Sequence, residues 1–143
     1  MLKRSLFVLL VLLGAGFMIF FASFDDGLGR EDIYYSTRGT DGWSEPINVG
    51  APINTPGYEG FPSLSADGKT LYFVKERDVE EIENKDIRKA MSLAYAIYSS
   101  KRNEDGTWQE PERVILQDPD KQSLDGCEFV LGNKMWFCTA RTG

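Results

Sequence analysis

The sequence predicts an all-β protein preceded by one N-terminal transmembrane helix. Three observations lead to this prediction. Residues 6–24 form an uncharged apolar run, strand-forming residues alternate with tight turns from residue 31 onward, and one order of features occurs twice in the chain. The length of 143 residues allows one domain, or part of a larger one.

The apolar run from Leu6 to Phe24 has the length of a membrane-spanning helix. At about 1.5 Å per residue its 19 residues reach about 28 Å, close to the roughly 30 Å hydrocarbon core. Lys3 and Arg4 precede the run, so the positive-inside rule places the N-terminus in the cytoplasm and the remainder outside. We expect residues 1–24 to be an uncleaved signal-anchor. The alternative is secretion after signal cleavage, although the run is longer than a usual cleaved signal.

The composition excludes several classes of function. The chain has 16 Lys and Arg, 22 Asp and Glu, two Cys and no His. Without histidine there is no Ser-His or Cys-His nucleophile pair and no histidine-ligated metal. An excess of carboxylates repels phosphate backbones, so we expect no nucleic-acid partner. We predict no catalytic residue, no metal and no cofactor.

Two segments in the first half carry the strand and turn signals. Residues 33–37 are rich in β-branched and aromatic types, and a turn at 40–42 leads to Trp43. Further on, residues 61–65 and 70–74 are expected to be two strands that flank a turn. That turn contains Asp67 and Gly68, and an Asp-Gly pair between apolar runs is a strong hairpin signal.

The same features return about 64 residues later. Tyr34 is matched by Tyr98 at a spacing of 64, and Trp43 is matched by Trp108 at a spacing of 65. Residues 71–73 are matched by residues 135–137, again at 64. This periodicity predicts that one structural module occurs twice.

One segment between the two copies is different. Residues 78–94 contain neither Gly nor Pro, and Ile87, Ala90, Met91 and Ala94 have the spacing of one helix face. We expect a short amphipathic helix over 79–93 that is inserted between strands. It covers a face of the domain or contacts a partner, or it is a decorated surface loop.

The repeated segments resemble the WD40-like β-propeller repeats of the TolB type. The first copy reads DIYYSTR at 32–38, DGWSEPINVG at 41–50 and APINTPGYEGFPSLSADGKTLYF at 51–73. The second reads AIYSSKR at 96–102 and DGTWQEP at 105–111. The resemblance implies a partial β-propeller over residues 25–143, with two antiparallel four-stranded blades at about 31–77 and 95–143. Trp43 and Trp108 would fill equivalent gaps between blades.

A propeller needs about four to eight blades, and two would leave open edges and apolar faces. We therefore expect the chain to be a piece of a longer or split reading frame. The alternative is a ring completed by association.

The anchor and the repeat together predict a membrane-anchored, extracytoplasmic binding module for a protein or glycan of the cell envelope, without enzymatic activity. One alternative is a fragment of a glycan-active propeller enzyme of the sialidase or lyase type. Another is a remnant of a split gene without a function of its own.

Cys127 and Cys138 are candidates for a disulfide. A two-residue turn at Gly132 and Asn133 would pair Leu131 with Lys134, and the same register places the two cysteines directly opposite each other. Oxidation suits an extracytoplasmic domain. The alternative is two reduced, buried thiols.

Overall fold

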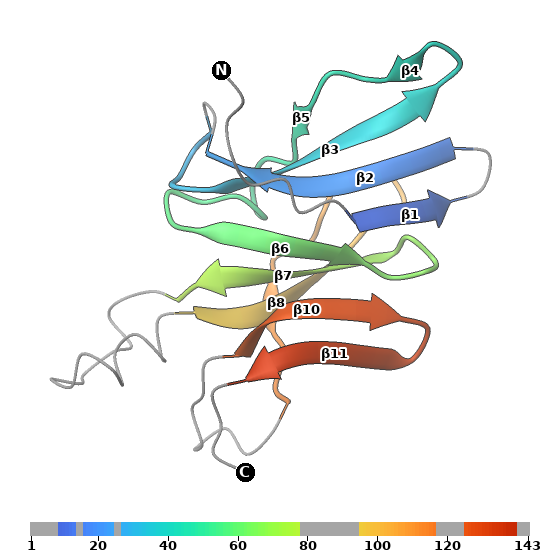
Figure 1. Cartoon of the computed structure of the whole chain (residues 1–143). Coiled ribbons are helices and arrows are strands. Elements are labelled where there is room, and N and C mark those ends of the chain that lie inside the picture. The colour runs from blue at the N-terminus through green and yellow to red at the C-terminus, as the bar shows by residue number, and fades with distance from the viewer. Residues whose placement is uncertain (1–8, 14–15, 25–26, 78–94, 117–124, 140–143) are drawn as a thin grey trace, which may run out of the picture.

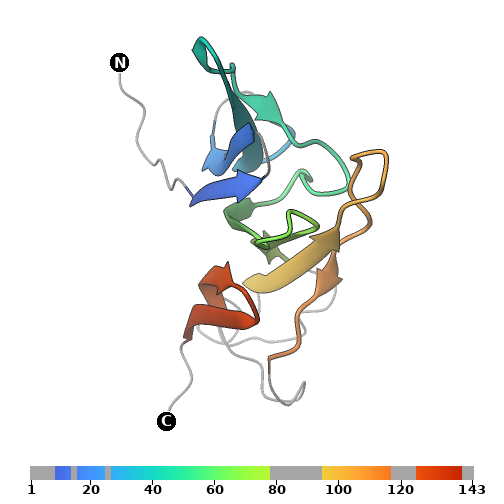
Figure 2. The same ribbon diagram turned by 90° about the vertical axis from the view of Figure 1, so that its right-hand side faces the viewer.

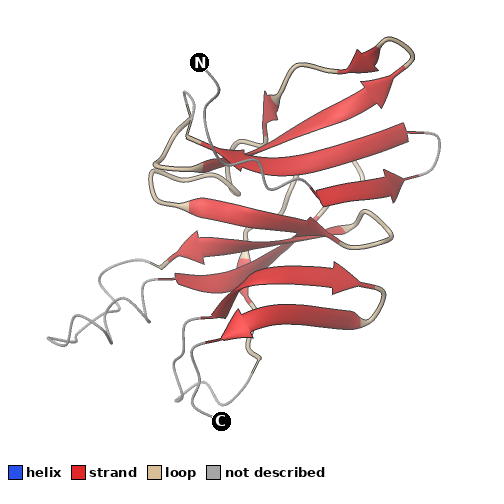
Figure 3. Ribbon diagram, viewed as in Figure 1, coloured by secondary structure: helices blue, strands red, loops and turns tan. Residues whose placement is uncertain are grey.

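The computed structural model describes residues 9–13, 16–24, 27–77, 95–116 and 125–139 of the chain. Every regular element in these ranges is a β-strand (Figure 3), which confirms the all-β class. The helix predicted over 79–93 lies outside the described residues. Within the described part, no helix has the length and apolar character needed to cross a membrane. The strands are β1 (Leu9–Leu13), β2 (Gly16–Ser23), β3 (Asp32–Gly39), β4 (Gly42–Trp43), β5 (Ile47–Asn48), β6 (Glu59–Leu64), β7 (Thr70–Glu76), β8 (Tyr95–Lys101), β9 (Glu112–Arg113), β10 (Asp125–Leu131) and β11 (Lys134–Thr139).

The strands form three antiparallel sheets that follow one another in chain order. The first sheet has the order β1-β2-β3-β4, with β5 also paired to β3, and the second has the order β6-β7-β8-β9. Strands β10 and β11 form a separate hairpin. Figure 1 and the turned view in Figure 2 show the second sheet between the first sheet and the hairpin.

The N-terminal apolar run is not helical where it is described. Residues 9–13 and 16–23 are strands, and β2 pairs with β3 from Phe17 opposite Arg38 to Ser23 opposite Asp32. The side chains of Phe20 and Ala22 are buried. A strand covered on both faces is as uniformly apolar as a membrane helix, so hydropathy alone could not separate the two.

The sheets also divide the chain differently from the two predicted blades. Strands β3 to β5 belong to the first sheet, whereas β6 and β7 belong to the second, although all lie within 31–77. Within 95–143, β8 and β9 complete the second sheet and only β10 and β11 lie beyond it. The reason is that β7 pairs with β8 along its whole length, while β3 is already paired with β2. Each sequence repeat therefore supplies the last strands of one sheet and the first strands of the next.

The two copies share the same local contacts. Arg38 pairs with Trp43 in the first sheet, and Arg102 pairs with Trp108 in the second. Each guanidinium lies over its indole ring, at 5.9 Å and 5.7 Å from the ring centroid. The hydroxyls of Ser36 and Ser100 donate to the backbone carbonyls of Ser44 and Gln109, at 3.0 Å and 2.5 Å.

The hairpin turn predicted at Asp67 and Gly68 is present between β6 and β7. The Asp67 carboxylate accepts hydrogen bonds from the Ser65 hydroxyl at 2.6 Å and from the Lys69 N–H at 3.0 Å. The hydroxyl donation lowers the pKa of Asp67. Gly68 has a φ of 71°, a conformation that side chains disfavour.

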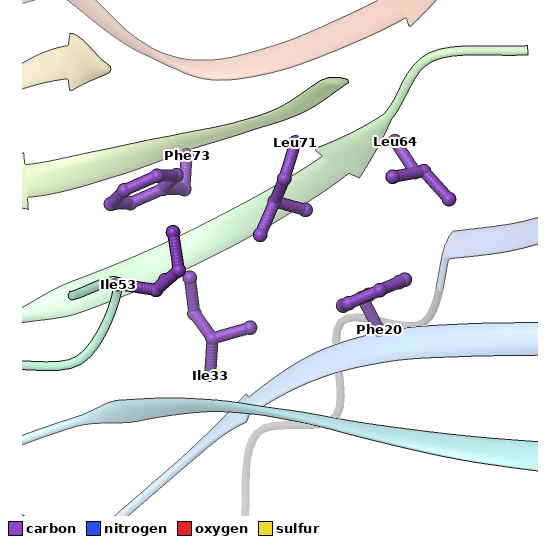
Figure 4. Close-up of a cluster of buried hydrophobic side chains, with 6 residues drawn as sticks. All are labelled: Phe20, Ile33, Ile53, Leu64, Leu71 and Phe73. Carbon is purple, nitrogen blue, oxygen red and sulfur yellow. The ribbon is translucent and has the colours of Figure 1, made fainter. Parts of the chain in front are cut away.

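The main core lies between the first and second sheets. It consists of six buried side chains from both sheets and the loop after β5 (Figure 4): Phe20, Ile33, Ile53, Leu64, Leu71 and Phe73. Asn54, which is 1% exposed, exchanges two hydrogen bonds of 2.9 Å with the backbone of Ile33. The core therefore positions the long loop after β5 as well as the strands.

A second interface lies on the other face of the second sheet. Strand β10 contacts β6, β7 and β8. The side chain of Val130 is buried, and its N–H donates to the hydroxyl of Ser63 at 3.0 Å. The hairpin therefore covers the second sheet much as the second sheet covers the first.

Candidate functional site

The main cavity lies where one end of the second sheet meets the β10–β11 hairpin. Its volume is about 520 Å³, within the range of ordinary ligand pockets. We call this cavity the rim pocket. Its walls are mostly apolar and come from the second sheet, the segment before β6 and the hairpin: Tyr58, Phe61, Val74, Tyr95, Asp125, Gly126, Cys127, Cys138 and Thr139.

Two equivalent bulges shape the rim pocket. In β6, Phe61 and Pro62 together oppose one residue of β7, and in β10, Cys127 and Glu128 together oppose one residue of β11. Phe61 and Cys127 have positive φ values of 51° and 53°, which are uncommon for residues with a side chain. Both residues follow a glycine and both line the pocket. A bulge re-aims the side chain it carries, and here it directs two side chains to one cavity.

Tyr58 and Tyr95 form the aromatic wall of the rim pocket, and the Glu31 carboxyl group binds the hydroxyl of Tyr58. The rings of Tyr58 and Tyr95 meet edge to face with centroids 5.4 Å apart. Burial raises the pKa of Tyr58 above its ordinary value, and the neighbouring Glu31 carboxylate raises it further. The Tyr58 hydroxyl therefore stays protonated and serves as a hydrogen-bond donor to Glu31, whose own pKa is raised by burial.

Cys127 and Cys138 both reach the pocket as free thiols. The predicted pairing of Leu131 with Lys134 is present, but the bulge shifts the register, so that Gly126 rather than Cys127 lies opposite Cys138. The direct opposition expected from the sequence is therefore wrong by one residue. Burial raises the pKa of the Cys127 thiol, and the neighbouring Cys138 raises it further. Whether the pair can be oxidised stays a prediction.

Glu128 is the most perturbed carboxyl group near the pocket. It is 5% exposed, and neither carboxyl oxygen has a hydrogen-bond partner among the described residues. Burial raises its pKa to about 8, so it is mostly protonated at neutral pH. This group therefore adds little negative charge to the hairpin interface at pH 7.

The predicted repeat positions serve the framework and do not line the rim pocket. Tyr34 stacks on Phe21 in the first sheet, and Tyr98 stacks on Phe73 in the second. Trp43 is 42% exposed, whereas Trp108 packs against the core. Asp67 and Gly68 form the β6–β7 turn, which precedes Thr70 at the start of β7. The pocket residue of β7 is Val74, near the other end of this strand. Of the predicted site residues, the two cysteines alone line the pocket.

Sequence reasoning missed the aromatic residues of the rim pocket. Tyr58 and Phe61 lie in the loop and bulge that begin β6, and Tyr95 begins β8. The available signal was the match of Gly60-Phe61 with Gly126-Cys127 at a spacing of 66. That match placed two residues at equivalent strand positions, but nothing local showed that the two strands face one another.

A second cleft, of about 480 Å³, lies between the β6–β7 turn and the turn after β8. Its lining is polar and carries both signs of charge, with Asp67, Lys69, Arg102 and Asp105 among the residues. Within the described ranges, no group of three or more His, Cys, Asp and Glu side chains could hold a metal ion. The rim pocket is therefore the better candidate for ligand binding.

Searches against models of protein families, curated proteins and solved structures find no match for this chain.

Proposed function

We propose that this chain is part of a TolB-like β-propeller and acts as a non-enzymatic binding module. Its ligand is an apolar side chain of a protein partner, which enters the rim pocket. The observation that carries the proposal is the position of the pocket. It is an apolar cavity with aromatic walls at the end of two stacked sheets, where a partner can reach it.

The stacking of the sheets supports the propeller part of the proposal. Consecutive sheets cover one another face to face, and equivalent Arg-Trp pairs lie at the edges of the first two. Neighbouring propeller blades pack in the same way around a central channel. The observed division of each repeat between two sheets is compatible with such an arrangement.

The chemistry of the pocket favours a protein over a glycan as the partner. Sugars are bound by many polar side chains together with an aromatic platform, whereas among the described residues Asp125 is the sole charged one that lines this cavity. Tyr58 and Cys127 are both held in their protonated forms, so neither is activated as a base or a nucleophile. These features support binding without turnover.

An extracytoplasmic location stays part of the proposal. Attachment to the membrane through Leu6 to Phe24 is in competition with the use of β2 as a strand of the first sheet, since one copy of the chain cannot do both. Proteolysis of intact cells and alkaline extraction of membranes would separate an anchored protein from a secreted one.

The test of the proposal uses small probes that mimic side chains and sugars. Indole and p-cresol are titrated into the full chain and followed by amide chemical shifts, with methyl glycosides and sialic acid as parallel titrations. We expect saturable shifts for the aromatic probes at Gly126 and Thr139, and none for the sugars. Thr139→Phe should fill the pocket and remove these shifts, whereas Lys134→Phe at the other end of β11 should not. Saturation by a sugar, or turnover of one, would contradict the proposal.

A further inference from the structure

A smaller cavity, of about 210 Å³, lies between the first and second sheets beside the main core. We call it the inter-sheet pocket. Its volume is enough for one aromatic ring, because an engineered apolar cavity of about 150 Å³ holds benzene. Among the described residues that line it, Arg102 is the sole charged one, and Phe20, Tyr35 and Trp108 are aromatic. The pocket therefore offers a ring site with one cation at its wall.

Both sheets contribute to the aromatic lining of the inter-sheet pocket. Phe20 points from β2 toward the second sheet (Figure 4), and its ring contacts two others. The centroid of Phe20 lies 5.9 Å from that of Tyr35 on β3 and 6.4 Å, edge to face, from that of Trp108 after β8. Offset and edge-to-face contacts of this kind stabilise a further aromatic ring. The ring site is therefore made by the contact of the two sheets.

The guanidinium of Arg102 is held in place at the pocket wall. It lies over the ring of Trp108, and its Nε donates to the carbonyl of Gly106 at 3.2 Å. Trp108 and Gly106 both line the pocket themselves. The four N–H groups on the two terminal nitrogens have no partner among the described residues. An arginine fork that is already oriented binds a carboxylate through two parallel hydrogen bonds and loses little side-chain freedom.

The carboxylate of Asp105, in the same turn as Arg102, is engaged elsewhere. It accepts hydrogen bonds from the hydroxyl of Thr107 at 2.6 Å and from the N–H of the same residue at 2.9 Å. These bonds, the hydroxyl first, lower the pKa of Asp105. Asp105 lines the neighbouring polar cleft and is not part of the described lining of the inter-sheet pocket. The charge at this pocket is therefore positive, although the whole chain has a formal net charge of -6 at pH 7.

The equivalent pair in the first copy of the repeat has different surroundings. Arg38 lies over Trp43 in the same contact, at 5.9 Å, but Trp43 is 42% exposed and neither residue is among the described lining of the inter-sheet pocket. Trp108 differs because it meets Phe20 of the preceding sheet. Arg38 therefore provides a matched control for Arg102.

We propose that the inter-sheet pocket is a binding site for a small aromatic carboxylate. The ring of the ligand packs against Phe20, Tyr35 and Trp108, and its carboxylate accepts two hydrogen bonds from the terminal nitrogens of Arg102. Each part of the ligand thus meets the part of the wall that suits its chemistry. The proposal goes beyond the binding of a protein partner and does not depend on the rim pocket.

The test follows the indole N–H signals of the three tryptophans in the isotope-labelled full chain during titration with benzoate, benzamide and acetate. We expect benzoate to shift the Trp108 signal saturably at millimolar concentrations. Benzamide lacks the charge and acetate lacks the ring, so each should bind about tenfold more weakly or worse. Trp43→Phe and Trp136→Phe assign the other two signals, since both side chains are partly exposed. Equal affinities for benzoate and benzamide, or saturable shifts confined to Gly126 in the rim pocket, would overturn the proposal.

Matched variants test the role of the arginine. Arg102→Gln should weaken benzoate binding about tenfold or more, whereas Arg38→Gln should leave it unchanged. Arg102→Lys, which keeps the charge but loses the planar fork, replaces Arg102→Gln if circular dichroism shows that the latter is unfolded, and it should also weaken binding. A benzoate affinity that is the same in the wild type and in the folded Arg102 variant would overturn the proposal, as would an equal loss in Arg38→Gln.

Discussion

The guanidinium of Arg102 lies over the indole ring of Trp108, with 5.7 Å between the guanidinium carbon and the ring centroid. The same contact occurs between Arg38 and Trp43 at 5.9 Å. The two tryptophans nevertheless have different surroundings. Trp108 meets Phe20 edge to face at 6.4 Å and packs against the core, whereas Trp43 is 42% exposed. One sequence motif therefore supports the fold in one copy and is largely on the surface in the other.

The first prediction concerns these two tryptophans. Trp108→Ala should lower the free energy of unfolding by about 2–3 kcal/mol, because it removes an aromatic side chain that joins both sheets. Trp43→Ala should cost less than about 1 kcal/mol, since a partly exposed cation–π contact is the main loss. Urea denaturation of both variants measures the difference. Equal losses would show that Trp108 does not join the two sheets.

The second prediction concerns the loop after β5. Asn54→Ala should destabilise the protein by about 2–4 kcal/mol, because the buried N–H of Ile33 loses its acceptor and the interior gains no replacement. Asn103→Ala is a control, because Asn103 makes its side-chain hydrogen bonds in an exposed turn. Thermal unfolding followed by circular dichroism should show a clear loss for the first variant and a small one for the second.

The third prediction separates a strand from a membrane anchor in the N-terminal run. Phe20→Ala should cost about 3–4 kcal/mol, because Phe20 is 2% exposed in the core. Phe24→Ala should change stability by less than about 0.5 kcal/mol, because Phe24 is 66% exposed. If the run is instead a transmembrane helix, neither substitution should affect unfolding of the remaining domain.

The fourth prediction is a dependence of stability on pH through Glu128. Burial raises the pKa of this acid from an ordinary 4.5 to about 8 in the folded state. Between these values the unfolded chain releases its proton and the folded chain keeps it, so stability falls as pH rises. The loss reaches about 4–5 kcal/mol by pH 8 and is absent below pH 4.5. Glu128→Gln should remove most of this slope, which urea denaturation at several pH values measures. A slope unchanged in the variant would contradict the assignment.

The fifth prediction concerns the reactivity of Cys127. Its raised pKa leaves little thiolate at neutral pH, so alkylation by iodoacetamide should be slow and should rise only at alkaline pH. Cys138→Ser removes the neighbouring thiol and should lower the apparent pKa of Cys127, while burial keeps it above the ordinary value. Mass spectrometry of labelled peptides gives the rate at each pH. Fast labelling of Cys127 at pH 7 in the wild type would contradict this prediction.

Local features of the sequence were enough to predict the β class, the Asp67-Gly68 turn and the pairing of Leu131 with Lys134. Each depends on residues that are close in the chain, such as a two-residue turn that fixes the register of its own hairpin. The local pairing of an arginine with each tryptophan is of the same kind, because Arg38 and Arg102 lie only five or six residues before Trp43 and Trp108, whereas the wider surroundings of the two indoles differ.

The tertiary structure alone decided which strands share a sheet and which residues meet at the rim pocket. Strand β7 shares a sheet with β8 and not with β3, and this depends on long-range pairing that no local pattern encodes. The bulge at Cys127 shifts the register by one residue, so that Gly126 and not Cys127 pairs with Cys138. Residues 16–23 form a strand because they pair with β3, which lies outside the N-terminal run. Apolar composition specifies that a segment is buried, but the choice between lipid and a neighbouring sheet depends on the rest of the fold.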